Sequence, residues 1–126
     1  MNRDIVAELE ATLPGFTGTE GYTRIRYPWA TILLTDGAKY LAETAKCYWL
    51  MDAISSYQPK LKTEYFQTWK LTVADGKGVL TATDGDDHKL ATQDIPGTPF
   101  PLAEITLFVI RDEGLGGVVV LLPSEY

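Results

Sequence analysis

The stretch TDGAKYLAETAKCYWLMDAISSYQ, residues 35–58, decides the predicted fold. Its Asp36-Gly37 pair is typical of a two-residue hairpin turn, because both central positions of a type I′ turn need φ > 0. Such a turn would pair Thr35 with Ala38 across two strands. After Thr44, which we expect to cap a helix, apolar residues recur every three or four positions and share one helical face: Cys47, Leu50, Met51, Ile54 and Tyr57. The stretch therefore predicts a hairpin that leads into an amphipathic helix.

Length and composition indicate one domain with an ordinary core. The chain has 126 residues, 45% of them hydrophobic and 22% charged, which is enough for a packed core without disulfides. Cys47, the single cysteine, lies on the apolar face of the predicted helix, where we expect a buried and unreactive thiol. No apolar run reaches the ~18 residues that a membrane-spanning helix needs, and acids interrupt the N-terminal segment where a signal peptide is apolar. We therefore expect one cytoplasmic domain over residues 1–126 that makes no contact with membranes.

Turn residues and period-two alternation predict the rest of the fold. Residues 4–13 fit a helix that Pro14-Gly15 ends. Residues 102–110 fit either a helix or a strand, and their β-branched and aromatic side chains favour a strand over 105–110. Residues 65–74 are predicted to form a strand, and its alternation places the side chains of every second residue toward the core: Gln67, Trp69, Leu71 and Val73. The other predicted strands cover residues 22–27, 30–35, 79–83, 88–95 and 118–122.

These elements predict a single α+β domain. Its mostly antiparallel sheet of five to seven strands packs against two helices.

The densest acidic cluster in the sequence comprises Asp84, Asp86 and Asp87, with Asp94 nearby. Carboxylates on a turn can hold a hard cation, but the terminal Glu of an EF-hand loop is absent. Asp-Gly-Asp-Asp is also typical of a hairpin tip, because Asp and Gly tolerate the left-handed conformation. His88 is the only histidine, so no Ser-His-Asp triad can be assembled without it, and a zinc site is less favoured still. We favour the turn, and we expect no metal, no cofactor and no catalytic residue.

Two further pairs of residues are candidate binding groups. Arg24 and Arg26 would project from the same face of a strand and form the best anion-binding pair, although solvated arginines are the commoner case. Tyr48 and Trp49 widen the apolar surface of the predicted helix beyond one face. Either a second element covers them in the core, which we favour, or part of this aromatic surface is an interface.

The net charge of −6 and the sequence pI of about 4.6 argue against direct binding of nucleic acid, which needs a basic face. Acidic surfaces commonly serve solubility, and they also dock on basic grooves of other proteins. The expected partner is therefore a protein, with the basic groove of a nucleic-acid-binding protein as the specific case. The candidate partner-binding residues are Asp84, Asp86, Asp87, Asp94, Tyr48 and Trp49.

Several segments, in this order and spacing, resemble a family of small bacterial, phage- and plasmid-encoded proteins described only as a domain of unknown function. They are FTGTE (16–20), TDGAKYLAE (35–43), YWLMDAISSYQ (48–58), FQTWKL (66–71), DG (84–85), FPL (100–102) and LPSEY (122–126). The resemblance implies no activity, cofactor or catalytic residue. It implies an origin on bacterial mobile elements and favours a role in conflict between phage and host. Relatives carry Asn or Gly where this chain has Asp86 and Asp87, which further weakens a metal site there.

Two classes of function follow from these observations. The leading one is a non-enzymatic, protein-binding accessory factor of a phage or mobile element, specifically an inhibitor of a host defence complex in the manner of an anti-CRISPR protein. The alternative is a small metal-dependent hydrolase or nucleotide-binding enzyme that uses the acidic turn 84–88 with Arg24 or Arg26.

Overall fold

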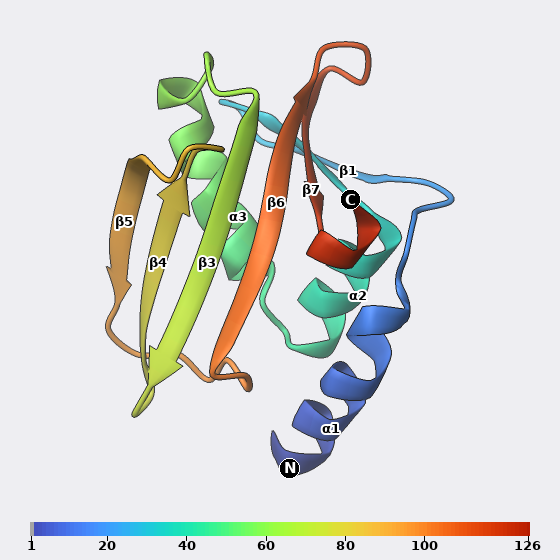
Figure 1. Ribbon diagram of the computed structural model, residues 1–126, viewed down its shortest axis with the longest axis vertical. Helices are drawn as coiled ribbons and strands as arrows, with labels where there is room; N and C mark the ends of the chain where they lie inside the picture. Colours follow the sequence, from blue (N-terminus) through green and yellow to red (C-terminus); the bar gives the residue numbers. More distant parts are fainter. Residues whose placement is uncertain (1) are drawn as a thin grey trace.

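A seven-stranded sheet with three α-helices on one of its faces forms the fold of residues 2–126, which the computed structural model describes (Figure 1). The helical elements are α1 (Asn2–Thr12), α2 (Asp36–Thr44) and α3 (Tyr48–Tyr57), with short 3-10 segments η1 (Leu13–Gly15), η2 (Gln58–Lys60) and η3 (Pro123–Glu125). The strands are β1 (Thr23–Arg26), β2 (Thr31–Leu34), β3 (Phe66–Ala74), β4 (Lys77–Thr83), β5 (Lys89–Ile95), β6 (Glu104–Asp112) and β7 (Gly117–Leu121).

The strand order is β1-β2-β7-β6-β3-β4-β5, and every neighbouring pair except one is antiparallel. The exception is β2 with β7, which run parallel with Leu33 beside Val119. The predicted mostly antiparallel α+β architecture is confirmed. The strand over 105–110 is confirmed as well, and β3, β4 and β5 form an antiparallel meander.

The main core lies between the helices and one face of the sheet. Trp69 is only 2% exposed, and it projects toward the helices together with Gln67 and Leu71, as the alternation of β3 predicts. Leu50, Met51 and Ile54 of α3 are buried against this face, so the predicted apolar side of that helix is correct. Cys47 is fully buried too, and burial raises the pKa of its thiol to about 12.

A pair of buried amides ties the end of α3 to β3. The side-chain nitrogen of Gln58 donates to the side-chain oxygen of Gln67 at 3.0 Å, and the Gln67 nitrogen donates back at 2.9 Å. The indole Nε1 of Trp69 donates to the same Gln67 oxygen at 2.8 Å. Each group thereby finds a partner inside the core, which removes most of the cost of burying it.

The predicted hairpin at Asp36-Gly37 is wrong, because these two residues begin helix α2. Four successive backbone N–H groups of this helix start have acceptors. Asp36 N donates to Thr19 Oγ1 at 2.9 Å, Gly37 N to Glu125 Oε2 at 3.0 Å, Ala38 N to Thr35 Oγ1 at 3.2 Å, and Lys39 N to the Thr35 carbonyl at 2.9 Å. Such complete capping stabilises a helix start, and two of the acceptors come from distant parts of the chain.

Gly37 therefore serves a purpose other than a positive φ. A Cβ on it would lie 2.6 Å from Leu122 Cδ1 and 2.7 Å from Glu125 Oε1. Close approach of the C-terminal segment requires glycine here. Strand β2 accordingly pairs with β1 and β7 and makes no hairpin with residues 38–41.

The expected N-cap at Thr44 is also wrong, since Thr44 is the last residue of α2. The chain leaves α2 through Lys46, whose φ is 54°, and the N–H of Cys47 donates to the Ala42 carbonyl at 2.9 Å. This is a Schellman-type helix end, in which the left-handed position is most often Gly. Lys46 occupies it here, so the end of α2 lacks the usual glycine signal. The predicted hairpin at Asp36-Gly37 accounts for the third helix, because it assigns the residues of α2 to a strand.

The type I′-like turn occurs instead at the second Asp-Gly pair. Asp75 and Gly76 have φ of 54° and 74°, and Ala74 pairs with Lys77 on either side. Both central residues thus adopt the left-handed conformation that a two-residue hairpin needs. Strand β4 consequently starts at Lys77, two residues before the predicted start.

Candidate partner-binding surface

One face of the sheet carries no helix of residues 2–126, the part of the chain that the structure describes. In Figure 1 the strands β3 to β6 stand in front of α3, and their near side is open. A second apolar cluster lies on this open face, separate from the main core. Its centre is buried and consists of Leu33, Val119 and Leu121, against which the partly exposed Phe108, Ile110 and Leu115 pack. We call the side of the sheet that bears this cluster the open face.

The strand registers place the apolar side chains of the open face in a row. Phe66 of β3 pairs with Ile110 of β6, which pairs with Val119 of β7, which pairs with Leu33 of β2. The last partner in the row is Arg24 of the edge strand β1. Side chains of directly paired residues point to the same side of a sheet, so the row runs unbroken across five strands.

Three aromatic rings extend this row. Phe66 and Phe108 lie with ring centroids 5.0 Å apart, and Tyr126 meets each of them edge-on at 5.5 Å. Tyr126 is 74% exposed, although its ring rests on the other two. Large aromatic side chains held in place at a surface are the usual anchors of protein interfaces.

The remainder of the open face is polar and rich in threonine. Lys70 forms an ion pair with Glu104 at 3.2 Å, and Val79 is an isolated exposed apolar residue. The threonines of this half lie on β3, β4, β5 and β6: Thr68, Thr72, Thr81, Thr83, Thr92 and Thr106. The open face is thus divided into an apolar half near β7 and a polar half near β4.

Arg24 and Arg26 are exposed on the open face of β1, and both point the same way, as the alternation of this strand predicts. Among residues 2–126, no carboxylate lies within 4.0 Å of either guanidinium. Asp94 is on the same face at the opposite edge strand, beside Val79. The structure therefore places Arg24, Arg26 and Asp94, three of the predicted binding residues, at the two edges of the open face.

The acidic turn 84–88 follows the last residue of β4, Thr83, which pairs with Thr68 of β3. Phe66 of the apolar row is two residues before Thr68 on the same strand, so the turn lies near that end of the row. The Asp84 carboxylate accepts from the N–H of Asp86 at 2.8 Å and of His88 at 2.9 Å, and it lies 3.1 Å from His88 Nδ1. The His88 N–H bond is the largest cause that holds the pKa of Asp84 below 3.8. Asp87 adopts a φ of 64°, as expected at a hairpin tip.

Asp84, Asp86 and His88 each offer a ligand atom within 4.8 Å of the others, which is the spacing of a cation site. Asp86 and His88 are exposed, and the hydrogen bonds of Asp84 within the turn account for its position without an ion. This cluster is explained by turn formation.

Tyr48 and Trp49 lie away from the open face, at the start of α3 in the helical layer. Trp49 is half-buried against the main core, and Tyr48 is exposed with its hydroxyl 3.5 Å from Glu43 Oε2. The structure does not bring these two aromatic residues together with the acidic turn and the arginines.

Sequence reasoning missed the residues of the open face itself. Phe66 falls in the outward set of β3, and Phe108 and Ile110 alternate with Leu107 and Val109, which face the core. The signal in the sequence was Phe66, an apolar residue in the outward set of a half-exposed strand, which indicates an apolar patch on the outer face of the sheet.

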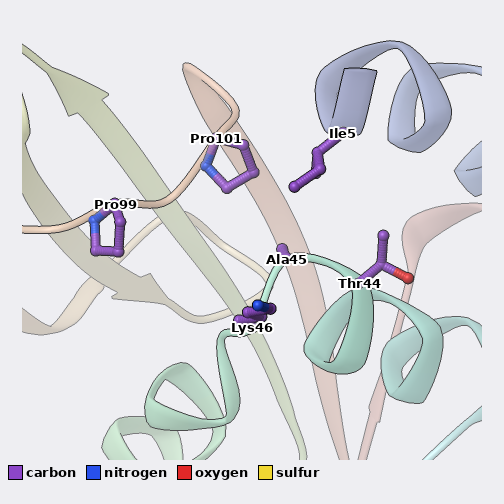
Figure 2. Close-up of a pocket in the computed structure, with 6 residues that line it drawn as sticks. All are labelled: Ile5, Thr44, Ala45, Lys46, Pro99 and Pro101. Carbon is purple, nitrogen blue, oxygen red and sulfur yellow. The ribbon is translucent and has the colours of Figure 1, made fainter. Parts of the chain in front are cut away.

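A hollow of about 180 Å³ lies between α1, the α2–α3 junction and the proline-rich segment before β6 (Figure 2). Figure 2 shows Ile5 and Pro101 on one side and Lys46, in its left-handed conformation, on the other. Apart from Lys46 its lining holds no charged group: Ile5, Thr44, Ala45, Pro99 and Pro101. It has the character of a packing gap where three segments meet.

Residues 7–126 match DUF6876, described as a family of unknown function. The chain belongs to DUF6876. This family assignment confirms the resemblance to a domain of unknown function. No curated protein matches this DUF6876 chain.

Among solved structures, the crystal structure of a protein of unknown function from Enterococcus faecalis is similar to this DUF6876 chain, with a TM-score of 0.57 and 16% sequence identity. The similarity covers 79% of this chain and 93% of that chain, and at this identity it concerns the fold alone. Within residues 2–126, no helix has the length and apolar character that crossing a membrane requires.

Proposed function

We propose that this protein is a non-enzymatic binding module whose open face receives a protein partner. The observation that carries the proposal is a group of apolar side chains on a sheet face that carries no helix of residues 2–126. Tyr126, which is 74% exposed, and the partly exposed Phe66, Phe108 and Ile110 lie beside the buried Leu33 and Val119. Contiguous apolar surface rimmed by polar groups is the usual mark of an interaction site.

Charge at the two ends of the row specifies the partner further. Arg24 and Arg26 at the β1 end favour carboxylates opposite them, because no carboxylate of residues 2–126 neutralises either guanidinium. The acidic turn beyond Phe66 favours basic groups, and Asp86 and Asp87 leave their carboxylates exposed there. The partner is thus a protein with an apolar patch, an acidic border on one side and a basic border on the other.

The narrower role of this module, inhibition of a host defence complex by a phage- or plasmid-encoded protein, follows from the sequence resemblance. The basic border of the partner is compatible with the rim of a nucleic-acid-binding groove, the type of partner expected from the net charge of −6. In a defence complex, the open face would cover protein surface next to such a groove.

The test is capture of a partner from host extract by the wild-type protein and by two variants. Phe66→Ala with Tyr126→Ala removes two anchors of the row, and we expect binding to weaken by about 30-fold or more, as for interface hot spots. Val79→Ala is the matched control, since Val79 is 42% exposed on the polar half of the same face. Thermal melts of the variants check that each is folded.

A partner retained by the double variant and lost by the control would contradict the proposal. Sedimentation of the purified protein measures whether a second copy of the chain binds to the open face. A dimer that the Phe66 and Tyr126 variant dissociates would mean that a second copy occupies the open face. Turnover of a small substrate by the purified protein, lost when Asp86 and His88 are replaced, would establish the alternative enzymatic function.

A further inference from the structure

A second, separate cavity of about 170 Å³ lies at the end of the sheet where β2 and β7 begin, against η2. Trp29 and Lys62 line it, together with Arg111 from the end of β6 and Gly117 from the start of β7. Both charged side chains of the lining are basic, although the chain as a whole carries a net charge of −6. A local concentration of positive charge in an acidic protein indicates an anion site.

The two cations of this pocket have no acidic partner in the part of the chain that the structure describes. Among residues 2–126, no carboxylate lies within 4.0 Å of Lys62 or Arg111. The Arg111 guanidinium donates from Nη2 to the Leu61 carbonyl at 3.2 Å, while its Nε is buried and has no hydrogen-bond partner among the described residues. Unsatisfied buried donors on a charged group are costly, so an anion that neutralises this guanidinium would bind with a favourable electrostatic term.

Trp29 forms an oriented aromatic wall beside these cations. It is 51% exposed, yet its indole Nε1 donates to Ser55 Oγ at 3.3 Å. Its ring stacks on Tyr27 at a centroid distance of 5.4 Å and an interplanar angle of 26°. The Tyr27 hydroxyl in turn donates to Asp52 of α3, which fixes the stack. An exposed tryptophan held in one orientation is prepared to stack on a planar ligand.

We propose that this pocket binds a nucleoside monophosphate, with the phosphate at Lys62 and Arg111 and the base against Trp29. A phosphate monoester carries close to two negative charges at neutral pH, which matches the two cations better than a carboxylate does. The cavity is smaller than the ~300 Å³ at which complete small-molecule sites begin, so it admits the phosphate and leaves the base at the rim. Trp29 stands there with half of its surface free.

Titration with adenosine 5′-monophosphate, followed by NMR, tests this assignment. The protein has three tryptophans, and a Trp29→Phe variant identifies the indole N–H signal of Trp29. We expect that signal to shift on titration. Lys62→Gln should weaken binding about tenfold or more by removing a charge-assisted contact, and Trp29→Ala about tenfold by removing the stack. Lys60→Gln is the matched control, an exposed lysine of η2 outside the lining.

Adenosine and inorganic phosphate separate the two halves of the ligand. Both should bind more weakly than the intact monophosphate. Binding of inorganic phosphate as tight as that of the monophosphate would overturn the role of Trp29, and equal losses from Lys62→Gln and Lys60→Gln would overturn the pocket. No shift of the Trp29 signal at millimolar ligand would overturn the whole assignment. The test replaces Lys62 and not the half-buried Arg111, because the Lys62 side chain is exposed and its replacement leaves the fold intact.

Discussion

Gln67 is fully buried, and its amide makes three hydrogen bonds with two side chains, Gln58 of η2 and Trp69 of β3. Removal of this one side chain would leave the Gln58 side-chain oxygen and the Trp69 indole N–H without these partners, while the Gln58 nitrogen keeps the Ile54 carbonyl at 3.1 Å. An unsatisfied buried donor costs about 1–3 kcal/mol, so polar residues of this kind are tied to one fold more strictly than their apolar neighbours. Gln58, Gln67 and Trp69 all lie in segments that carry the family resemblance.

A single carboxylate at the acidic turn gives a testable pH dependence. The hydrogen bond from the His88 N–H, together with that from Asp86, lowers the pKa of Asp84 below 3.8. A lowered folded-state pKa means that ionised Asp84 stabilises the fold above the unfolded pKa, and that this contribution is lost as pH falls through the folded pKa. Asp84→Asn should therefore melt below the wild type at pH 7, and the difference should shrink as the pH falls below 3.8.

Melting temperatures measured from pH 7 down to acid decide this prediction. Asp86→Asn is the control, because that residue donates its backbone N–H to Asp84 and its exposed carboxylate accepts none of the hydrogen bonds of the turn. A gap between wild type and Asp84→Asn that stays constant with pH would contradict the role given to the ionised carboxylate.

Helix α2 shows how an element depends on parts of the chain that are far away in sequence. Its first turn takes acceptors from Thr19, from its own N-cap Thr35, and from Glu125, which is 88 residues beyond Gly37. The Glu125 carboxylate also accepts from the Thr35 hydroxyl at 2.6 Å and the Leu122 N–H at 2.9 Å. A negative charge at a helix N-terminus is favourable through the helix dipole as well as through hydrogen bonds.

We expect Glu125→Ala to lower the free energy of unfolding by about 1–2 kcal/mol, as for loss of a helix cap. Glu125→Gln retains one acceptor oxygen and should lose less. Denaturant unfolding measures both, with Glu113→Ala as control, since Glu113 is exposed in the β6–β7 turn. Equal stability of Glu125→Ala and the control would show that the C-terminal segment does not cap α2 in solution.

The molecule as a whole has a covered and an uncovered side, and its charges are not evenly placed on the uncovered one. Arginines stand at the β1 end of the apolar row and carboxylates at the turn beyond Phe66. Such an arrangement orients an approaching partner before contact, because charges act over about a Debye length of 8–10 Å while apolar contacts act only at touching distance. The pocket beside η2 is lined by neither Phe66 nor Tyr126, so its occupancy and the docking proposal can be tested with different variants.

The charge arrangement predicts the kinetics of association with the partner that the open face captures. Asp86→Asn with Asp87→Asn removes the two exposed carboxylates and leaves Asp84, which the turn needs. Asparagine tolerates the left-handed φ of 64° at position 87, so the fold should be kept. We expect slower association, a weaker dependence of the rate on salt, and a smaller change in dissociation.

Surface-based kinetics at two ionic strengths measure this effect. Asp75→Asn, at the tip of the β3–β4 hairpin at the other end of the sheet, is a control with the same change of charge and a similar left-handed backbone. Association at low salt that is unchanged in the double variant, or equally slowed by the control, would exclude steering by the acidic turn.

Local patterns in the sequence determined the parts of this protein that depend on neighbouring residues alone. The alternation of β3 identified Gln67, Trp69 and Leu71 as core, and the spacing in α3 identified Leu50, Met51 and Ile54. Both patterns depend only on backbone periodicity, because the strand and helix geometry alone decides which side chains share a face. The charge and direction of Arg24 and Arg26 were likewise visible in the alternation of β1.

The tertiary structure alone decided what the repeated Asp-Gly dipeptide becomes. Asp75-Gly76 forms the two-residue turn with positive φ, while Asp36-Gly37 starts a helix because Thr19 and Glu125 supply acceptors from distant segments. The parallel pairing of β2 with β7, and with it the apolar row of the open face, joins residues more than eighty positions apart, as the Thr35–Val120 hydrogen bond at a separation of 85 illustrates. A dipeptide or a strand cannot specify partners that are distant in sequence, because those contacts form only after the chain between them closes into a long loop.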